Sequence, residues 1–419
     1  MIASVISIGD ELLIGQTVNT NASFIASELN LAGIPVKSVY TIADTRDDIF
    51  YALQQASQLT DLIILTGGLG PTNDDITKNA LCEYFHSKLV LHQPSLKNIQ
   101  ELFYKRGVRV TGVNHDQALI PHNCNPIKNS MGTAPGMWFQ KDKKHYISMP
   151  GVPFEMKAMM TDEIIPALIK LHISTPIIHK TLLATGIGES ALAELISEWE
   201  KNLPSTIKLA YLPEPGIVKL RLSCYDAADA KTKRMIDTQV NKIKKLIPDL
   251  IFGIENDTLQ SVTGNMLLKR RATLSTAESC TGGLIAHLIT SVPGSSKYFK
   301  GSVIAYDNAV KTEILGIDPK VIKKHGAVSE EVVRAMALGA QKLLKTDYAL
   351  ATSGIAGPDG GTPDKPVGTV WIALATPEKT FAEKLMLGNH RERNIRRASL
   401  AALNLLRKNL LYISFFELN

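Results

Sequence analysis

The sequence predicts an α/β protein in which two α/β domains are joined by a small α+β module. Short apolar runs alternate with segments of helical periodicity at both ends of the chain, which is typical of largely parallel, doubly wound sheets. A length of 419 residues exceeds what one hydrophobic core usually supports, so two or three domains are expected. With 45% apolar and 21% charged residues, and no low-complexity tract, the composition is that of a globular protein.

The first domain is expected over residues 1–170. SVISIG predicts a buried strand, and NTNASFIASELNLAG predicts a helix that an Asn or Thr caps and Gly33 ends. A second strand follows in IPVKSVYTIAD, and the next helix carries an apolar stripe at Ile49, Leu53, Ala56 and Leu59. The strand DLIILTGG then runs directly into glycines. Ligands of such folds bind at the carboxyl ends of strands, where these glycines lie.

Two further units follow. Residues 176–252 predict the α+β module, with a helix in GESALAELISEWEKNL, strands in IKLAYLP and IVKLRLS, and a lysine-bearing helix in AKTKRMIDTQVNKIKKLI. Ile236, Val240 and Ile243 form an apolar stripe on that last helix, so its lysines are expected to form a solvated face rather than an RNA-binding one. Residues 257–415 predict the second α/β domain, which opens with a helix through TLQSVTGNMLLKR.

Charge and cysteine usage restrict the class further. The net charge of +6 permits an anionic substrate such as a phosphate ester, but it is too diffuse to indicate nucleic acid. Four scattered cysteines without C-x-x-C spacing argue against a disulfide framework or zinc knuckle and fit a reducing compartment. No secretory pattern opens the sequence, and no apolar run approaches the roughly 20 residues that span a bilayer. A cytoplasmic protein without a membrane partner is therefore expected.

The first candidate site is LTGGLGPTNDDIT, residues 65–77. Its glycines let the backbone approach a ligand closely, and amides at a following helix start can cradle phosphate. Asp74 and Asp75 in the same loop favour a hard divalent cation that bridges carboxylate and phosphate oxygens. Asp10 and Asp44 fall at the ends of predicted strands and can converge on the same crevice. The alternative interpretation is that these aspartates are turn and capping residues.

The second candidate site is AESCTGG, residues 277–283. A strand through Leu274 and a helix from about Gly282 would place Ser279 and Cys280 on the connecting turn, where free amides can stabilise an oxyanion. A serine nucleophile needs a base. Lys311, desolvated beside a tyrosine, can lose its proton near neutral pH and accept the serine proton. The alternative interpretation of AESCTGG is a helix start that its glycines make flexible. The alternative interpretation of Lys311 is a surface lysine.

Two later stretches extend this second site. ATSGIAGPDGGTPDKPVGTVWIAL, residues 351–374, predicts a strand, a glycine-rich loop and a returning strand that wall a pocket. GNHRERNIRRA, residues 388–398, places arginines at a helix start, and one or two of them are expected to reach a substrate phosphate. The four are Arg391, Arg393, Arg396 and Arg397.

The motifs IGDELLIGQTVNTNASFIASEL, TGGLGPTNDDIT and MPGVPFEM resemble the molybdopterin-binding-type (MoaB/MogA-type) domain of the CinA family, competence/damage-inducible protein A. The resemblance implies a metal- and potassium-dependent ADP-ribose pyrophosphatase, with magnesium, manganese or cobalt as the metal. It also places a KH-like module in the central unit, although TGIGES lacks the G-x-x-G clamp of RNA-binding KH domains. The implied substrate-binding residues are Asn19, Asn21, Thr66, Gly67, Gly68, Gly70, Thr72 and Glu155, and the implied metal residues are Asp10, Asp44, Asp74 and Asp75.

AESCTGG, YDNAVK, GAVS, SGIAGPDGGT and KPVGTV resemble the CinA C-terminal domain, which also occurs alone as the nicotinamide mononucleotide deamidase PncC. The resemblance implies an α/β sandwich that converts nicotinamide mononucleotide to nicotinate mononucleotide and ammonia without a cofactor, and a homodimer. It makes Ser279 the nucleophile and Lys311 and Tyr306 its base and proton relay; His390 stands where the family usually has aspartate. The implied binding residues are Cys280, Thr281, Gly282, Gly283, Asn308, Gly354, Gly357 and Arg391.

Three rival interpretations stay open. Cys280, with Glu278 and Lys311, would imitate a glutamate–lysine–cysteine amidase. The chain could instead be a non-catalytic nucleotide-binding scaffold that serves DNA uptake or repair, which would require a basic surface that the composition does not plainly show. The last rival is a chain whose N-terminal domain alone is active.

Overall fold

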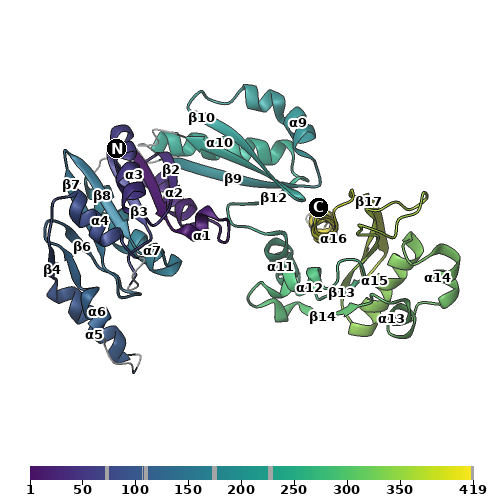
Figure 1. The fold of residues 1–419 in the computed structure, drawn as a ribbon. Helices are drawn as coiled ribbons and strands as arrows, with labels where there is room; N and C mark the ends of the chain where they lie inside the picture. Colours follow the sequence, from purple (N-terminus) through teal and green to yellow (C-terminus); the bar gives the residue numbers. More distant parts are fainter. Residues whose placement is uncertain (71–74, 106, 108–111, 172–176, 225–229, 417–419) are drawn as a thin grey trace. The chain divides into compact units, whose positions relative to one another are not determined.

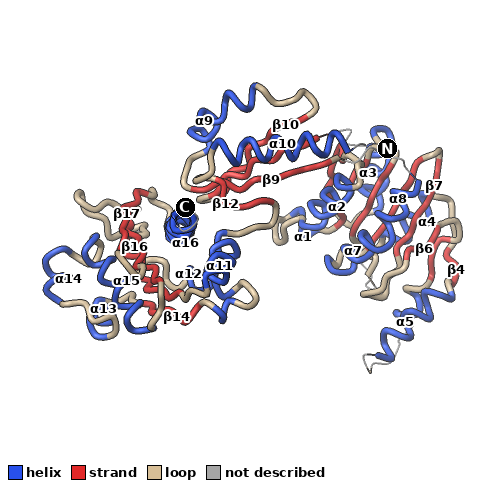
Figure 2. The backbone as a smooth tube through the Cα atoms, turned by 180° about the vertical axis from the view of Figure 1, so that it is seen from behind, coloured by secondary structure: helices blue, strands red, loops and turns tan. Residues whose placement is uncertain are grey.

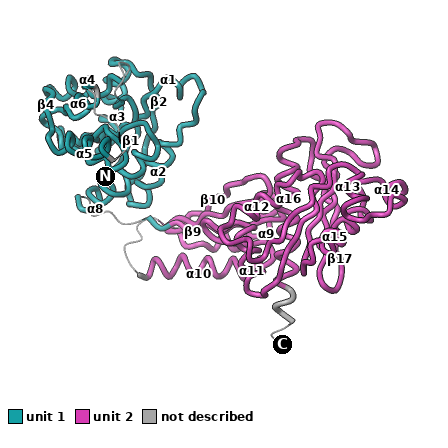
Figure 3. Tube along the Cα trace, turned by 90° about the horizontal axis from the view of Figure 1, so that it is seen from below, with its two compact units in different colours: residues 1–178, 225–230 teal, residues 179–224, 231–419 magenta. Residues whose placement is uncertain are grey.

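The computed structural model describes residues 1–70, 75–105, 107, 112–171, 177–224 and 230–416. These residues form two compact units, one built on residues 1–178 and the other on residues 179–224 and from 231 onward (Figure 3). The predicted class, two α/β domains and a small α+β module, is confirmed (Figure 1). None of the described helices combines the length and the apolarity that crossing a bilayer requires.

Unit 1 contains a six-stranded sheet in the order β2-β1-β3-β8-β7-β6, with a two-stranded β4-β5 ribbon beside it. Its first four strands pair in parallel, whereas β7 and β6 are antiparallel additions. The strands are β1 (Ala3–Ile8), β2 (Val36–Ile42), β3 (Leu62–Thr66), β4 (Leu89–Leu91), β5 (Leu119–Pro121), β6 (Asn125–Ile127), β7 (Gly136–Lys141) and β8 (Lys144–Met149). The helices are α1 (Asp10–Leu13), α2 (Thr20–Leu31), α3 (Arg46–Leu59), α4 (Thr77–Tyr84), α5 (Gln93–Lys105), α6 (Gly112–Asp116), α7 (Pro153–Met159), the π-helical turn η1 (Met160–Ile164) and α8 (Ile165–Leu171).

Both faces of this sheet are covered, because its central strands are apolar on both sides. The helices α2 and α7, with η1 and α8, pack on one face around Ile25 and Met160. The helices α3 and α4 pack on the other around Leu53 and Leu81. As predicted, Asn19 caps α2, since its side chain accepts the N–H of Ala22. The doubly wound arrangement directs the carboxyl ends of β1 and β3 into the candidate site.

Unit 2 begins with the α+β module, a four-stranded sheet in the order β10-β11-β9-β12. The predicted stripe of Ile236, Val240 and Ile243 is buried, so the lysines of α10 lie on the opposite, solvated face. The strands are β9 (Ile178–Thr185), β10 (Ile207–Glu214), β11 (Ile217–Cys224) and β12 (Ile251–Ile254), and the helices are α9 (Glu189–Lys201) and α10 (Ala230–Leu246).

The rest of unit 2 is an α/β sandwich around a five-stranded sheet in the order β14-β13-β15-β16-β17 (Figure 2). The strands β14, β13 and β15 run parallel, and β16 and β17 return antiparallel. The strands are β13 (Leu274–Glu278), β14 (Phe299–Ile304), β15 (Tyr348–Gly354), β16 (Thr369–Ala375) and β17 (Thr380–Met386). The helices are α11 (Leu259–Arg270), α12 (Leu284–Thr290), the 3-10 turn η2 (Ser295–Lys297), α13 (Asn308–Glu313), α14 (Pro319–His325), α15 (Glu330–Leu344) and α16 (Arg391–Phe416).

The α+β module and the sandwich share one core. Leu183 and Phe252 of the module belong to the same buried cluster as Leu403 of α16. Arg407 of α16 is 2% exposed, and its guanidinium donates to the carbonyl oxygens of Asp249 and Ile251 in the module. Two regions that the sequence separates therefore fold together.

Candidate active site

Three parallel strands of the sandwich end side by side at the predicted serine. Glu278, the last residue of β13, is level with Ile304 of β14 and Thr352 of β15. The N–H of Ser279 donates to the carbonyl oxygen of Thr352 at 3.0 Å, and the N–H of Ala305 donates to that of Glu278 at 2.8 Å. Ser279 is only 9% exposed. It lies on the turn at the carboxyl edge of the sheet, where parallel α/β sheets bind ligands.

The buried carboxylate of Glu278 organises that turn. It is 0% exposed and accepts hydrogen bonds from the Thr281 hydroxyl at 2.7 Å and from the N–H groups of Gly283, Ile285 and Ala286 at 2.8–3.1 Å. A carboxylate is favoured at this position because the first turn of a helix leaves its N–H groups unbonded and carries a partial positive charge. Sequence reasoning assigned Glu278 only to the rival cysteine mechanism, whereas here it fixes the start of α12.

The hydrogen bonds of this turn show which N–H groups beside Ser279 are already used. The N–H of Gly283 is already bound to Glu278, and the N–H of Gly282 donates to the carbonyl of Ser279. Within the described part of the chain, the N–H groups of Cys280 and Thr281 donate to no backbone carbonyl or carboxylate. These two amides are therefore the donors that remain for a developing negative charge beside Ser279.

Cys280 has the environment of a core residue. It is 6% exposed and belongs to the apolar cluster that contains Leu274 and Ile285. Burial raises the pKa of its thiol to about 12, so the nucleophilic thiolate is scarce at neutral pH. Burial therefore makes the Cys280 thiol a weak nucleophile at neutral pH.

Lys311 of α13 is the buried cation that the sequence predicted beside the serine. It is 1% exposed, and its Nζ donates to the carbonyl oxygens of Ala305 at 2.7 Å and Tyr306 at 3.0 Å. Both carbonyls directly follow β14, the strand next to the one that ends before Ser279. Burial lowers the pKa of Lys311, partly opposed by Asp307 and Cys280. Among the described residues, no hydrogen bond joins Ser279 Oγ to Lys311 Nζ.

The predicted proton relay through the Tyr306 phenol differs from what the structure contains. Tyr306 is 61% exposed, and its phenol oxygen accepts a hydrogen bond from Arg391 Nη2 at 3.2 Å. Among the described residues, the hydrogen bond between Tyr306 and Lys311 is made by the backbone carbonyl of Tyr306 and not by its phenol. Arg391 also donates from Nη1 to the carbonyl of Gly357 at 2.8 Å. Tyr306 and Arg391 therefore form one side of the site, next to the glycine-rich loop.

The remaining residues of the predicted set have simpler surroundings. Asn308 is exposed and is the first residue of α13, whose N-terminus Asp307 caps. A Cβ at Gly354 would lie 2.6 Å from Val370 Cγ2, and one at Gly357 would lie 2.6 Å from Val367 Cγ1. These two glycines therefore permit the close packing of the β15–β16 hairpin, which carries the Gly357 carbonyl toward Arg391.

The arginines of α16 point to different places. Arg391 contacts Tyr306, whereas Arg393 and Arg397 line a separate cleft against the α+β module, and Arg396 lines a third one. His390 Nδ1 accepts a hydrogen bond from the backbone N–H of Arg393 at 3.4 Å. A histidine thus fills the helix-capping position of the expected aspartate.

In unit 1 the glycine loop lies between β1 and two aspartates. A Cβ at Gly67 would lie 2.2 Å from the carbonyl oxygen of Ile8. A Cβ at Gly68 would lie 2.1 Å from Thr77 Oγ1 and 2.8 Å from Asp44 Oδ1, and one at Gly70 would lie 2.4 Å from Asp75 Oδ2. The carboxylates of Asp44 and Asp75 therefore lie against the loop, and their role toward phosphate and metal stays a prediction. Thr72 and Asp74 lie outside the described residues.

The predicted metal set is incomplete in the described ranges. They contain no group of three or more His, Cys, Asp or Glu side chains that could hold a metal ion. Asp10 is exposed and is the first residue of α1. Two carboxylates are compatible with magnesium, which commonly takes one or two protein carboxylates and completes its shell with substrate phosphates and water.

The predicted substrate-binding asparagines have mainly structural contacts. Asn19 caps α2, and its Nδ2 donates to Thr41. Asn21 Nδ2 donates to Thr66 Oγ1 at 3.3 Å and to the carbonyl of Gly151 at 2.7 Å. The Asn21 Oδ1 atom is buried and accepts no hydrogen bond among the described residues, so it can receive a ligand donor beside Thr66.

Glu155 supports a loop that sequence reasoning missed. Its carboxylate accepts from Asn129 Nδ2 at 2.7 Å, and Asn129 Oδ1 accepts the N–H groups of Met131 and Gly132. Asn129 is 3% exposed. The only sequence signal was an asparagine before a glycine in NSMGTAPG, which is typical of a turn.

Comparison with known proteins identifies the family. Three family descriptions match the chain: "Probable molybdopterin binding domain" over residues 4–170, "Damage-inducible protein CinA KH domain" over residues 179–253 and "CinA C-terminal domain" over residues 256–410. A CinA-like protein of Flavobacterium psychrophilum is 48% identical over 415 residues, which cover 98% of this chain and 99% of that protein. The chain belongs to the CinA family.

The chain is also similar to other proteins of the CinA family. A CinA-like protein of Cytophaga hutchinsonii is 47% identical over 409 residues, which cover 97% of this chain and 98% of that protein. The crystal structure of a CinA protein from Thermoplasma acidophilum is 37% identical and covers 40% of this chain and 97% of that one, with a TM-score of 0.37. The three family descriptions confirm the resemblance drawn from the motifs for all three parts of the chain.

In this CinA-family chain Asn394 is a further residue that the motifs did not reveal. It is 1% exposed, and its Nδ2 donates to the carbonyl oxygens of Ala356 at 3.0 Å and Gly388 at 2.9 Å. The amide thus ties the glycine-rich loop to the first turn of α16, which carries Arg391. Its signal in the sequence was only that it is the one uncharged polar side chain in RERNIRR.

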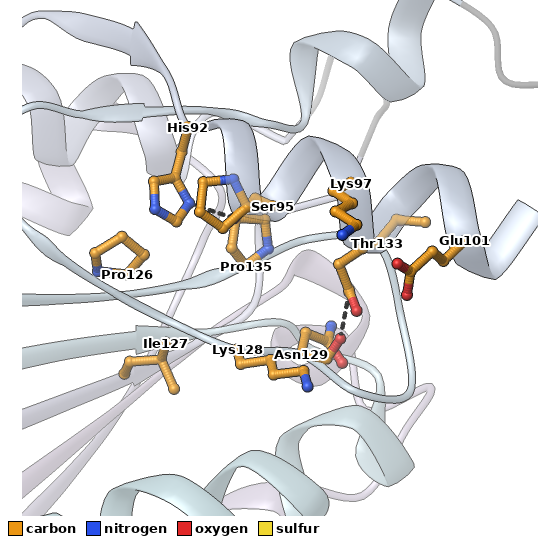
Figure 4. A pocket seen from close by; sticks show the side chains of 12 residues that line it. His92, Ser95, Lys97, Glu101, Pro126, Ile127, Lys128, Asn129, Thr133 and Pro135 are labelled. Carbon is orange, nitrogen blue, oxygen red and sulfur yellow. Dashed lines mark hydrogen bonds between the residues drawn. The ribbon is translucent and has the colours of Figure 1, made fainter.

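A separate cavity in unit 1 of about 360 Å³ lies between α5 and the segment from Pro126 to Pro135 (Figure 4). His92, Ser95 and Lys97 line one side of it, and His92 Nδ1 is hydrogen-bonded to Ser95 Oγ at 2.8 Å. Of the substrate and metal residues expected from the CinA motifs, none lines this cavity in the described part of unit 1. It therefore adds nothing to the glycine-loop site.

Proposed function

We propose that the C-terminal domain hydrolyses the carboxamide of nicotinamide mononucleotide to nicotinate mononucleotide and ammonia. The observation that supports this most is the pairing of two features at one sheet edge. Ser279 lies on the turn after β13, and the buried amine of Lys311 is held by the carbonyls that follow the neighbouring strand. Serine–lysine pairs of this kind suit acyl transfer because a desolvated lysine can serve as a base near neutral pH.

The hydrogen bonds of Lys311 fit its neutral form. A neutral amine has two N–H groups and one lone pair. The carbonyls of Ala305 and Tyr306 can bind both N–H groups, which leaves the lone pair to accept a proton from Ser279. Burial favours this form, since it penalises the ammonium. A small side-chain adjustment on substrate binding would complete the serine–lysine contact.

The reaction then proceeds in two halves. Ser279 Oγ attacks the carboxamide carbon while its proton passes to Lys311 Nζ, and the N–H groups of Cys280 and Thr281 stabilise the oxyanion. The C–N bond breaks, the nitrogen takes the proton from Lys311, and ammonia leaves an ester on Ser279. A water molecule that gives its proton to Lys311 attacks this ester, and the bond from the acyl carbon to Ser279 Oγ breaks. Ser279 Oγ takes the proton back from Lys311, and the product leaves as an acid that ionises in water. Arg391, with Tyr306, would orient the substrate through its phosphate or its carbonyl group.

The decisive experiment measures ammonia release from nicotinamide mononucleotide in the presence of EDTA, with three proteins compared. The wild type and Cys280→Ala should release ammonia at similar rates, and Ser279→Ala should lose at least about 10³-fold in rate. Loss of activity in Cys280→Ala with Ser279→Ala still active would move the nucleophile to the cysteine. A wild type without ammonia release would reject the deamidase, and nucleotide binding without turnover would favour the scaffold interpretation.

We further propose that unit 1 is a metal-dependent ADP-ribose pyrophosphatase. The placement of Asp44 against Gly68 and of Asp75 against Gly70 supports this second function. A divalent metal (magnesium, manganese or cobalt) would neutralise the pyrophosphate charge, and potassium is a further candidate cofactor. Asp44 and Asp75 would hold the metal, and the glycine loop would hold the phosphates close to the backbone. AMP release from ADP-ribose should require added metal, disappear with EDTA and be unaffected by Ser279→Ala.

A further inference from the structure

A second cleft in unit 2 lies between the α+β module and α16, away from Ser279. Its volume is about 770 Å³, which is within the usual range for a small-molecule site. One wall is the glycine turn Gly186–Gly188 with the start of α9, and the opposite wall is the face of α16 that carries Arg393, Arg397 and Asn404. TGIGES, which forms the turn, is the motif that neither proposed activity uses.

The start of α9 presents unbonded donors to this cleft. Gly188 is the residue before the helix, and no side chain caps it. The first helical N–H that finds a carbonyl partner among the described residues is that of Leu192, which donates to Gly188. The N–H groups of Glu189, Ser190 and Ala191 are therefore available, and a helix start of this kind attracts anions.

An independent observation comes from the opposite wall. Asn404 is 6% exposed, and its Oδ1 is used by Arg407 Nε at 2.9 Å. Its Nδ2 finds no acceptor among the described residues, and it lies 3.5 Å from the position of a Cβ on Gly186. Since Asn404 Nδ2 has no acceptor among the described residues, it is available to a ligand in the cleft that Asn404 lines. The Asn404 side chain points at the same glycine turn that precedes α9.

The charges of the cleft define the class of ligand. Arg397 is held by a 2.8 Å hydrogen bond from Nη1 to the carbonyl of Leu387, and its other N–H groups remain for a ligand. Four cationic and three acidic side chains line the cleft, and one of the acids, Glu214, is already paired with Lys219. The cations are Lys384, Arg393, Arg397 and Lys408, and the acids are Glu189, Glu214 and Glu383.

We infer that this cleft binds a small phosphorylated molecule, with the phosphate between the start of α9, Asn404 and Arg397. The N–H groups at the start of α9, Asn404 Nδ2 and the Arg397 guanidinium are all donors, which suits the acceptor-only oxygens of a phosphate. The carboxylates around it can accept from hydroxyl groups of the same ligand, and they oppose a long polyanion such as RNA. Because the two walls come from different modules, the bound molecule would add a contact between the α+β module and α16.

The test uses the full chain, EDTA and inorganic pyrophosphate as the probe, with hydrogen exchange of the peptide around residues 186–196 as a local readout. Pyrophosphate should slow exchange in the first turn of α9. Gly188→Asp should abolish this protection, since the new carboxylate caps the helix and occupies the anion position. A Cβ at Gly188 meets nothing within 4 Å, so this variant should fold. Arg397→Gln should raise the half-saturating concentration about tenfold or more.

Arg396→Gln is the matched control, because it removes the same charge from the same helix but lines the neighbouring cleft. It should leave the protection unchanged, as should Ser279→Ala, which keeps this test separate from the deamidase. The inference fails if pyrophosphate gives no protection at millimolar concentration. It also fails if Arg396→Gln weakens the protection as much as Arg397→Gln, or if an RNA oligonucleotide protects α9 and pyrophosphate does not.

Discussion

Lys311 Nζ and the carbonyl oxygen of Ala305 lie 2.7 Å apart, in a place where the lysine is 1% exposed. The contact ties the amine of a helix to the end of β14, beside the strand that leads into Ser279. It gives the proposed base a fixed position without a carboxylate partner. Burial lowers the pKa of Lys311, and the opposing effects of Asp307 and Cys280 are smaller.

Replacement of Lys311 tests this arrangement. Lys311→Met should reduce the rate of ammonia release by about 10²–10⁴-fold, the usual contribution of a general base. In the wild type, kcat/KM should rise with pH through the lowered pKa of Lys311, because only the neutral amine accepts a proton. Lys320→Met, which alters an exposed lysine of α14, should change neither value. A Lys311→Met enzyme with wild-type activity would exclude lysine as the base.

The same shift has a consequence for stability. Since burial lowers the pKa of Lys311 in the folded state, the unfolded chain binds more protons in the pH window between the folded and unfolded pKa values. The free energy of unfolding contributed by this group therefore rises with pH across that window. Urea unfolding between pH 7 and 10 should show this rise in the wild type and a smaller one in Lys311→Met. Equal slopes for the two proteins would contradict it.

Glu278 should be among the most sensitive residues of the sandwich. Glu278→Gln replaces an acceptor of four hydrogen bonds by a group with one acceptor oxygen, and it leaves N–H groups of α12 unpaired. We expect a loss of roughly 2–4 kcal/mol in the free energy of unfolding. Urea titration followed by circular dichroism measures it. Glu313→Gln, at an exposed position, is the control and should cost almost nothing.

The Cys280 thiol should be inert in the folded protein. With a pKa of about 12, roughly one thiol in ten thousand is ionised at pH 8, and the side chain is 6% exposed. Iodoacetamide should therefore leave Cys280 unmodified in the native state and react with it in urea, as peptide mass spectrometry can show. Rapid native alkylation that stops ammonia release would restore the cysteine as nucleophile.

Replacement of Gly68 should reduce one of the two proposed activities and leave the other unchanged. An added Cβ would lie 2.1 Å from Thr77 Oγ1 and 2.8 Å from Asp44 Oδ1, at a φ of +61° that favours glycine. Gly68→Ala should reduce ADP-ribose hydrolysis by about 10²-fold through misplacement of the loop and leave ammonia release intact. Gly15→Ala has a similar φ of +74° but meets nothing within 4 Å, so it controls for backbone strain alone. Equal losses in both variants would assign the effect to strain.

Replacement of His390 by aspartate should increase the stability of the protein. It caps α16 through a long 3.4 Å hydrogen bond from the N–H of Arg393. His390→Asp should shorten this bond and place a negative charge at the helix start, for a gain of about 0.5–1 kcal/mol. Thermal unfolding of the variant against the wild type checks the sign. His390→Ala should lose stability, and a loss in both variants would show that the capping interpretation is wrong.

Local rules predicted the elements better than the contacts between them. The alternating runs predicted the strands and the layers of helices, because apolar period and capping residues act over a few neighbours. Leu59 shows the limit: it continues the stripe of Ile49 and Leu53 but is 51% exposed, and it is the last residue of α3. The core shared by the module and α16 depends on residues more than 150 positions apart and left no periodic signal.

In the candidate site, too, the sequence predicted some features and could not predict others. The motifs predicted Ser279, Lys311 and Arg391 in one region. Ser279 follows β13, Lys311 of α13 is bonded to the carbonyl of Ala305 after the neighbouring β14, and Arg391 of α16 is bonded to the carbonyl of Gly357. The motifs could not reveal that Gly283 has already donated its N–H, or that the Tyr306 phenol turns outward to Arg391. Which donors are already bonded depends on the directions of side chains, and the spacing of motifs does not determine these.

The buried guanidinium of Arg407 has a consequence for any attempt to divide the chain. A fragment that begins after residue 256 would keep this charge but lose the carbonyls of Asp249 and Ile251 that bind it. Protease digestion should accordingly release two stable fragments rather than three, with the α+β module and the sandwich together. For crystallisation or enzymology the chain is best divided near residue 177, at the boundary between the two compact units.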